Sequence, residues 1–391
     1  MKYNFDIVVD RNNNRAGKYD ERQKKFGTTD VIPLWIADMD FQTAQPIINA
    51  CVEKAMEGIW GYTCRPDSYF DAILGWQYRR HGWKIDKEKV SWSLGVVPAL
   101  SSIVKVFTNE GDSIMIQTPV YSEFYDVTEA WERKVVENQL VEEDGKWTVD
   151  FADFEEKAKD PKVKIFLLCN PHNPLGIVWT KEQLQKMFEI CYANDVLMVS
   201  DEIHSDLVFH GKKHTPTAMI SEKAKDHVIS CISGTKTFNL AGLQASTTVF
   251  PSLEMKAAFD KFWMNLDIHR NNAFSSVAME AAFNEGEEWL EQLLPYISEN
   301  FDFIKDYCEK YIPKIKPNVP DATYLVWLDC RELGMNNERL RKFMIEEAKL
   351  GLNEGYTFGR SLSGYMRLNA ACPRSVLAKA MKQLEDAVNS L

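Results

Sequence analysis

Short apolar runs alternate with amphipathic segments through the middle of the chain. An apolar run over residues 165–168 precedes a polar loop and then Thr180-Lys181-Glu182-Gln183, a capping-box pattern that predicts a helix start. The apolar residues that follow recur at helical spacing, at Leu184, Met187, Phe188 and Cys191. Further apolar runs over 196–199 and 228–232 predict two more strands. This order indicates an α/β fold built on a parallel sheet with right-handed crossovers.

Three polar side chains follow the ends of these predicted strands. Asn173 lies in the loop 170–176, Asp201 closes the second apolar run, and Lys236 follows the third. The carboxyl ends of parallel strands border the ligand crevice of an open α/β sheet. We therefore expect the three side chains to lie together at one edge of the sheet.

The chemistry of these residue types matches the needs of pyridoxal 5'-phosphate (PLP). A lysine amine forms a Schiff base with this cofactor, a carboxylate keeps its pyridine nitrogen protonated, and an amide binds its phenolic oxygen. Each residue also has an ordinary interpretation: Lys236 as a surface lysine, Asp201 as a helix cap or solvated acid, and Asn173 as part of an Asn-Pro turn. The ordered set favours the cofactor roles.

Motifs along nearly the whole chain resemble those of fold-type I PLP enzymes, and within them the cystathionine β-lyase-like C–S lyases related to aminotransferases. The matching motifs are residues 33–41, Gly61-Tyr62, Asn173-Pro174, Asp201-Glu202-Ile203-His204, Lys236 and residues 365–369. The resemblance implies a large PLP-binding domain over residues 50–285 with a mostly parallel, seven-stranded-type sheet. A smaller α/β domain would combine residues 1–49 with residues 286–391.

Further cofactor contacts are implied by the resemblance. Tyr121 matches the aromatic residue that stacks on the pyridine ring, although a core tyrosine is the alternative. His204 occupies a place where aminotransferases usually have a tyrosine that touches the phenolic oxygen, and it either takes over that contact or packs beside the site. Ser233 is expected to donate its hydroxyl to the phosphate.

Two other parts of the chain are expected at the phosphate. A glycine-containing turn delivers the start of a helix at Val96 and Val97, whose free N–H groups suit a phosphate. Tyr62 matches the family tyrosine that reaches the phosphate of the neighbouring subunit's cofactor. That match implies a homodimer with shared active sites.

Arg367 matches the family arginine that binds the α-carboxylate of an amino-acid substrate. A planar guanidinium orients a carboxylate better than a lysine does, and a structural salt bridge is the alternative. Backbone groups at Ile36 and Ala37 are the expected second contact. Aspartate-type aminotransferases carry a phosphate-binding arginine eight residues after the lysine, whereas this chain has Gln244. This departure favours the lyase branch.

These features predict β-elimination of cystathionine or related cysteine S-conjugates to a thiol, pyruvate and ammonia. An aminotransferase acting on an amino acid and a 2-oxo acid is the alternative, because the same machinery supports transamination. A binding or regulatory protein on this fold would not need Lys236, Asp201 and Arg367 together.

Composition and residue spacing bear on the partners, the compartment and the metal content of the protein. The 391 residues carry a net charge of −11 without a basic stripe, which argues against a nucleic-acid partner. No apolar run approaches the ~20 residues that a membrane span needs, and the eight cysteines lack CxxC spacing, as expected in the reducing cytoplasm. His210 and His214 have the spacing of a zinc pair, but no third ligand follows, so we expect no metal.

Overall fold

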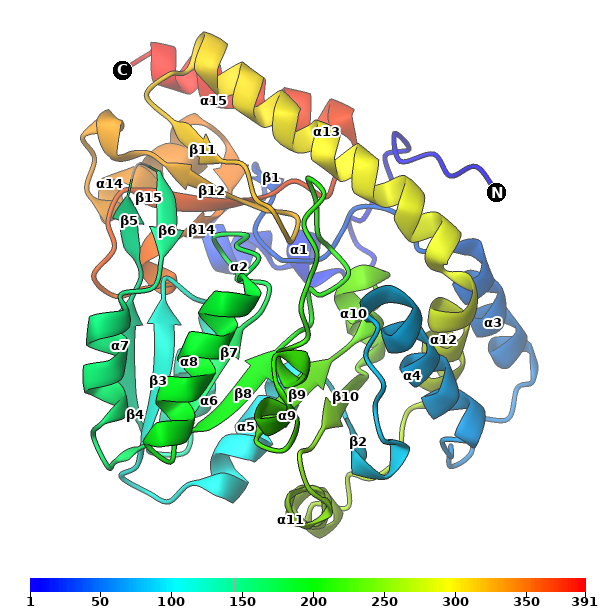
Figure 1. Cartoon of the computed structure of the whole chain (residues 1–391). Helices are drawn as coiled ribbons and strands as arrows, with labels where there is room; N and C mark the ends of the chain where they lie inside the picture. Colours follow the sequence, from blue (N-terminus) through cyan, green and yellow to red (C-terminus); the bar gives the residue numbers. More distant parts are fainter. Residues whose placement is uncertain (144) are drawn as a thin grey trace.

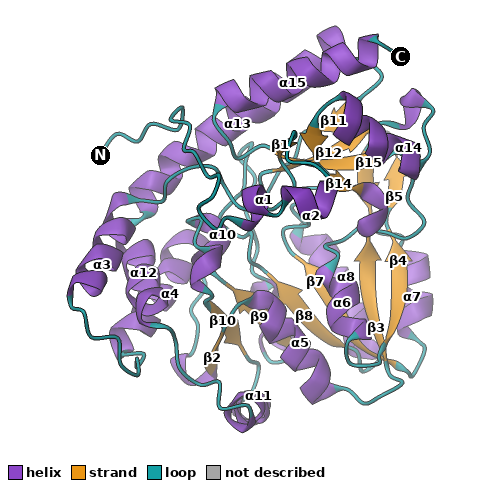
Figure 2. Cartoon of the chain, turned by 180° about the vertical axis from the view of Figure 1, so that it is seen from behind, coloured by secondary structure: helices purple, strands orange, loops and turns teal. Residues whose placement is uncertain are grey.

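A seven-stranded sheet forms the centre of the molecule (Figure 2). The computed structural model describes residues 1–143 and 145–391. In spatial order the strands are β2 (Val90–Ser93), β10 (Ser246–Val249), β9 (Val228–Ile232), β8 (Leu197–Asp201), β7 (Val163–Cys169), β3 (Ser113–Thr118) and β4 (Lys134–Gln139). Neighbouring strands are parallel except that β10 runs antiparallel to β2 and to β9. The predicted α/β fold with a mostly parallel sheet is confirmed.

Helices cover both faces of this sheet. One face packs against α5 (Val96–Phe107), α6 (Glu123–Glu129) and α11 (Leu253–Asn265), and the other against α7 (Phe151–Ala158), α8 (Lys181–Ala193) and α9 (Glu222–Lys225). In β7, Ile165 and Leu167 face the first group while Phe166 and Leu168 face the second. Because both faces are buried, the central strands read as continuous apolar runs, and the sequence pattern could locate them.

The predicted helix start at Thr180 is also confirmed. The Thr180 hydroxyl accepts a hydrogen bond from the Gln183 backbone N–H at 3.2 Å, and the Gln183 side chain accepts one from the Thr180 N–H at 3.0 Å. These two bonds satisfy N–H groups that the first turn of α8 would otherwise leave free.

A second, four-stranded antiparallel sheet lies beside the first. Its spatial order is β11 (Lys316–Asn318), β12 (Leu325–Asp329), β15 (Tyr365–Asn369) and β14 (Asn353–Glu354). Figure 1 shows α13 (Glu287–Tyr311) and α15 (Arg374–Asn389) running alongside one another over this sheet. A further helix, α14 (Asn337–Lys342), continues into a π-helical turn over Phe343–Glu347.

The remaining elements lie at the ends and edges of the two sheets. Next to the β2 edge, α3 (Gln45–Met56) and α4 (Asp67–His81) pack on α12 (Ala273–Glu285). Short elements are α1 (Gly17–Asp20), α2 (Arg22–Phe26), α10 (Gly234–Thr237), the paired strands β5 (Val141–Glu143) and β6 (Lys146–Thr148), and 3-10 turns at Lys87–Lys89, Thr217–Met219, Ala241–Leu243, Arg331–Leu333 and Gly355–Thr357.

The N-terminal segment joins the C-terminal part of the chain through a small parallel pair. Strand β1 (Ile32–Pro33) pairs with β13 (Leu350–Gly351). The expected boundary at residues 49 and 50 lies within α3, and the division into two domains remains a prediction. Within the described part of the chain, no helix combines the length and the apolar character that a membrane crossing requires.

Candidate active site

The polar residues at the strand ends meet around one cavity of about 170 Å³. Asp201 is the last residue of β8, Asn173 lies in the loop after β7, and Lys236 lies in α10, directly after β9. The cavity is lined by eight of the residues named from the sequence: Ala37, Val96, Val97, Tyr121, Asn173, Asp201, His204 and Lys236. The parallel neighbouring strands β7, β8 and β9 thus bring Asn173, Asp201 and Lys236 together at this cavity.

Asp201 is a buried carboxylate with a single backbone donor. Its Oδ1 accepts a hydrogen bond from the Ile203 N–H at 3.1 Å. Burial raises the pKa of Asp201 to about 7, while that hydrogen bond and the nearby Lys236 amine act in the opposite direction. A positive group placed against the other oxygen would favour the ionised form. The pyridine nitrogen of PLP, when protonated, is such a group, and the carboxylate fits it.

Lys236 directs its amine toward the N-terminal segment of the chain. Its Nζ donates a hydrogen bond to the Ala37 carbonyl oxygen at 2.5 Å, and the buried Tyr324 hydroxyl donates to the same oxygen at 2.8 Å. Burial lowers the pKa of Lys236 to about 8; Asp38 raises it and Arg367 lowers it further. An amine with this pKa is partly neutral near pH 8 and can therefore act as a nucleophile or a base.

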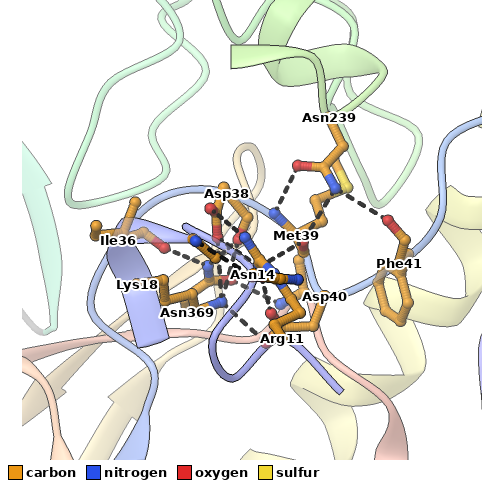
Figure 3. Close-up of polar contacts among 12 residues, drawn as sticks. Arg11, Asn14, Lys18, Ile36, Asp38, Met39, Asp40, Phe41, Asn239 and Asn369 are labelled. Atoms are coloured by element: carbon orange, nitrogen blue, oxygen red, sulfur yellow. Dashed lines mark hydrogen bonds and ion pairs between the residues drawn. The ribbon is translucent and has the colours of Figure 1, made fainter. Parts of the chain in front are cut away.

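Residues 36–41, which contain Ala37, are held by side chains from two distant parts of the chain (Figure 3). The Asn239 side chain accepts from the Met39 N–H at 2.9 Å and donates to the Met39 and Phe41 carbonyls, both at 3.0 Å. The Asn369 amide donates to the Ile36 carbonyl at 2.7 Å and to the Asp38 carbonyl at 2.6 Å. Because Asn239 is three residues from Lys236, this clamp ties the segment directly to the lysine's own turn.

Two cations from the N-terminal segment complete this network. Arg11 makes a bidentate pair with Asp38 at 3.1 and 2.9 Å and also bonds Asp40 at 2.6 Å. Lys18 is fully buried, and its Nζ lies 2.9 Å from Asp40 Oδ2. Burial alone would raise the pKa of Asp38, but the Arg11 and Lys18 charges hold it below its ordinary value. The segment that faces the cavity is therefore fixed from behind by paired buried charges.

Arg367 lies on β15 beside the cavity rather than in its lining. Its guanidinium donates to the Trp35 carbonyl and to Asn353 Oδ1, both at 2.8 Å, and to Asn173 Oδ1 at 3.2 Å. Its Nε is buried without a hydrogen-bond partner among the described residues. Burial lowers the pKa of Arg367 to about 10, so the side chain remains a cation near neutral pH. The free Nε is the sort of donor that a bound carboxylate would satisfy.

His204 is buried in the cavity wall and stays neutral. Burial, together with the Lys236 and Arg367 charges, lowers its pKa to about 3. Its Nδ1 has no hydrogen-bond partner within the described part of the chain. A neutral imidazole beside the site suits a hydrogen bond to a cofactor oxygen, and packing alone would leave that nitrogen unsatisfied.

The expected phosphate contacts divide into two groups. Val96 and Val97 line the cavity at the first turn of α5, after the N-cap Gly95, whose φ of 154° suits glycine. The Ser233 hydroxyl is instead occupied: it donates to the Ala245 carbonyl at 2.7 Å and accepts from the Thr235 N–H at 3.1 Å. Thr235 lines the cavity, and its hydroxyl lies 2.8 Å from the Ser233 hydroxyl; because Ser233 donates to Ala245, Thr235 is the donor in this pair.

Tyr62 and Ile36 lie outside the cavity of their own chain. The Tyr62 side chain is 93% exposed, and its ring lies 4.9 Å from the Arg270 guanidinium. The Ile36 carbonyl is bonded to Asn369. Sequence reasoning also missed Gln244 as a cavity-lining residue and Tyr324, Asn239 and Lys18 as supports. Gln244, eight residues after Lys236, and Asn239, three residues after it, carried a signal in their distance from the lysine.

A second buried polar network lies behind Asp201 and Lys236. Glu202 accepts from His214 at 2.9 Å and from the Thr217 N–H at 3.0 Å, which gives His214 a structural partner. Asp206 lies 2.9 Å from His81 Nε2 and accepts from the Thr237 hydroxyl at 2.8 Å. Residues adjacent to Asp201 and Lys236 are thus anchored by hydrogen bonds. Among the residues that the structure describes, no three potential metal ligands converge.

Comparisons with known proteins agree with this architecture. The chain is 40% identical to the protein named cystathionine beta-lyase PatB from Bacillus subtilis, over 99% of this chain and 100% of that protein. It matches the PLP-bound structure of a putative aminotransferase from Clostridium difficile with a TM-score of 0.97 at 45% identity, over 99% of this chain and 100% of the other. The PLP-containing structure of cystalysin from Treponema denticola matches with a TM-score of 0.97 at 34% identity, over 100% of both chains.

The family model described as aminotransferase class I and II matches residues 29–384. That range includes both sheets and every residue named from the sequence for the site. By this match and by its full-length relatives, the chain belongs to the class I and II aminotransferase family.

Proposed function

We propose that this chain is a PLP-dependent carbon–sulfur lyase that converts cystathionine or a related cysteine S-conjugate to a thiol, pyruvate and ammonia. The observation that carries this function is the convergence of Lys236, Asp201 and Asn173 on one cavity, in a chain that is 40% identical along its whole length to a cystathionine β-lyase. The aminotransferase alternative remains the competing reaction, because the family includes such enzymes.

The residues present fit the cofactor at each of its polar groups. Asp201 would hold a proton on the pyridine nitrogen, Asn173 would donate its amide to the phenolic oxygen, and the first turn of α5 would bind the phosphate. The Asn173 oxygen already accepts from Arg367, so its amide nitrogen is left to donate. When bound, the cofactor supplies an electron sink that stabilises negative charge on the substrate's α-carbon.

The chain's own groups then divide the remaining work. Arg367 binds the substrate α-carboxylate and orients the α-carbon toward Lys236. Lys236 would anchor the cofactor through its amine, whose pKa burial lowers to about 8 in the cofactor-free chain, and the same amine would take the proton from the α-carbon. Neutral His204 and the aromatic ring of Tyr121 would limit where the pyridine ring of the cofactor can lie. The β-sulfur would then leave as a thiolate, and water would hydrolyse the released three-carbon enamine to pyruvate and ammonia.

The proposed assembly is a cytoplasmic homodimer in which Tyr62 serves the partner's phosphate. Its support is the exposure of Tyr62 together with the neighbouring apolar side chains Met56, Ile59 and Trp60, which are 81%, 79% and 61% exposed. All eight cysteines are free, in keeping with a reducing compartment.

The decisive experiment compares two reactions of the purified, PLP-loaded protein. L-cystathionine should yield pyruvate continuously without added 2-oxo acid, and Lys236→Ala should abolish that yield. The same amino acid with 2-oxoglutarate tests transamination. A higher kcat/KM for amino-group transfer than for pyruvate release would show that the protein is mainly an aminotransferase and not a lyase.

A further inference from the structure

The carbonyl oxygen of Ala37 is shared by two donors. The Lys236 Nζ donates to it at 2.5 Å, and the Tyr324 hydroxyl donates to it at 2.8 Å. A backbone carbonyl has two lone pairs, so these two hydrogen bonds use its full capacity as an acceptor. The protonation and the direction of the Lys236 amine therefore depend on an oxygen that Tyr324 also binds.

The backbone on either side of Ala37 is fixed independently of these two donors. The Asn369 amide donates to the Ile36 carbonyl at 2.7 Å and to the Asp38 carbonyl at 2.6 Å. The Ala37 carbonyl between them is left for Lys236 and Tyr324, and Ala37 itself lines the cavity. Because the acceptor is held in place, it can set the position of a donor that binds it.

Tyr324 follows a residue whose backbone conformation is unfavourable. Thr323 has a φ of 71°, a left-handed value that is rare for a β-branched residue. The chain holds it there, because the Thr323 N–H donates to the Leu207 carbonyl at 2.8 Å and the Thr323 hydroxyl accepts from the Leu325 N–H at 3.1 Å. Strained residues of this kind concentrate at functional sites, and this one directly precedes the tyrosine that binds the Ala37 carbonyl.

Tyr324 itself is buried behind the cavity wall. Its side chain is 1% exposed, and its ring packs edge-on against His204 with the ring centroids 6.0 Å apart. Burial raises the pKa of the Tyr324 hydroxyl, so this group stays protonated and acts as a donor. Tyr324 is not among the described residues that line the cavity. Its hydroxyl can therefore affect a ligand only through Ala37 and Lys236.

We propose that Tyr324 is a positioning residue that acts on the Lys236 amine through the Ala37 carbonyl. By sharing the carbonyl oxygen, the Tyr324 hydroxyl weakens it as an acceptor for the ammonium form and favours the neutral amine, which is the reactive form. One N–H bond held by a fixed oxygen also limits where the lone pair of the amine can point. This inference rests on the proposed role of Lys236 as the anchor of the cofactor.

The rate at which the cofactor-free protein forms a Schiff base with added PLP tests this effect. The neutral amine adds to the aldehyde carbon of PLP and water leaves, so the rate rises with pH through the pKa of Lys236, which is about 8. Tyr324→Phe leaves the whole acceptor to Lys236 and should raise the midpoint of this pH profile by about 0.5 unit or more. Near pH 7 the rate, followed by absorption, should then fall about threefold or more.

Replacing Tyr324 alone with 3-fluorotyrosine changes the same hydrogen bond in the opposite direction. The fluorine makes the phenol a stronger donor at nearly the same size, so the midpoint should lie below that of the wild type. Tyr307→Phe is the matched control, because the Tyr307 hydroxyl donates to Glu385 between α13 and α15, and its midpoint should equal that of the wild type.

The expected order of midpoints runs from Tyr324→Phe at the top, through the wild type, to the fluorinated protein at the bottom. A Tyr324→Phe midpoint no higher than that of the Tyr307→Phe control shows that the proposal is wrong. If Tyr324→Phe does not fold, the fluorinated protein decides alone, and a midpoint equal to or above that of the wild type overturns the proposal.

The same measurements separate this inference from the proposed function. If Lys236→Ala still forms the Schiff base at the wild-type rate, Lys236 is not the anchor and both are wrong. If Lys236→Ala abolishes the reaction while Tyr324→Phe leaves the midpoint unchanged, only this inference is wrong. Schiff-base formation requires no carbon–sulfur cleavage. A protein that shows the expected order of midpoints but releases no pyruvate from L-cystathionine therefore refutes the lyase and leaves this inference intact.

Discussion

Residues 36–41, part of which lines the cavity, and the exposed residues around Tyr62 differ in how their polar groups are paired within the chain. The polar groups of the first segment are hydrogen-bonded within the chain by Arg11, Lys18, Asn239 and Asn369 (Figure 3). Tyr62 and Arg270 instead stack on each other at the surface. The chain therefore pairs the polar groups of residues 36–41 internally and leaves Tyr62 at its surface.

The two regions also differ in the desolvation free energy of their charged side chains. Burying Lys18 with Asp40 requires removing both from water, and only close pairing offsets that cost. Arg270 is exposed against the Tyr62 ring, so its charge stays hydrated and carries little desolvation cost. The buried pairs hold residues 38–40 against the N-terminal segment, whereas Arg270 stays at the surface.

The largest expected effect is on the buried side. Lys18→Met should lower the free energy of unfolding by about 3–5 kcal/mol, because it leaves Asp40 buried with Arg11 as its remaining cation. Chemical denaturation of the cofactor-free protein measures the change. Lys382→Met, which breaks an exposed pair with Asp386, should cost about 1 kcal/mol or less. Equal effects of the two substitutions would remove the contrast between buried and exposed charges.

Asp201→Asn should reduce kcat by a factor on the order of 10²–10³, about 3–4 kcal/mol, because the amide cannot hold a proton on the cofactor's pyridine nitrogen as charge develops. Steady-state pyruvate release measures kcat, and the cofactor content, from its absorption, should stay close to wild type. A variant with nearly normal kcat would exclude Asp201 from this role.

The same substitution predicts a pH effect on stability. The pKa of Asp201 is about 7 in the folded cofactor-free protein and about 3.9 when unfolded. Between these values the folded state binds more protons, so the free energy of unfolding should fall as the pH rises from 4 to 7. Asp201→Asn should remove this part of the decrease in parallel denaturation series. Identical slopes would show that Asp201 titrates normally.

Asn239→Ala should cost about 1–3 kcal/mol of unfolding free energy, because three backbone groups of Met39 and Phe41 lose their partner. It should also raise KM for amino-acid substrates more than it lowers kcat, since the segment positions the substrate rather than the ring. Asn389→Ala at the exposed end of α15 serves as the neutral control. A pure stability effect without a change in KM would restrict Asn239 to a structural role.

The smallest effect on stability is expected at the exposed Tyr62. Tyr62→Phe should change the unfolding free energy of the single chain by less than about 0.5 kcal/mol, because its hydroxyl bonds nothing in the described part of the chain. It should still lower activity by weakening PLP binding. Mixing Tyr62→Phe and Lys236→Ala chains should restore part of the activity. Full activity of a verified monomer would show that Tyr62 is an ordinary surface residue with no role in a partner's site.

Local patterns determined much of the fold and part of the site. The apolar runs predicted the central strands because those strands are buried on both faces, and the capping box at Thr180 predicted the start of α8 because its bonds span three residues. Asn173, Asp201 and Lys236 could be placed together because parallel strands end at one edge of a sheet. The family motifs then identified the class I and II aminotransferase family, which the comparisons confirm.

Contacts between distant parts of the chain were decided only by the tertiary structure. Asn239 bonds Met39 across 200 positions, and Arg65 bonds Asn271 across 206. The Ser233 hydroxyl donates to the Ala245 carbonyl, a hydrogen bond that the local sequence did not predict. Nothing in the local sequence of Lys18 distinguishes it from a surface lysine, and nothing around Arg270 indicates that it stacks on Tyr62. The spacing of apolar residues shows which side of a helix or strand is buried. The hydrogen-bond partner of a side chain depends instead on where distant parts of the chain pack.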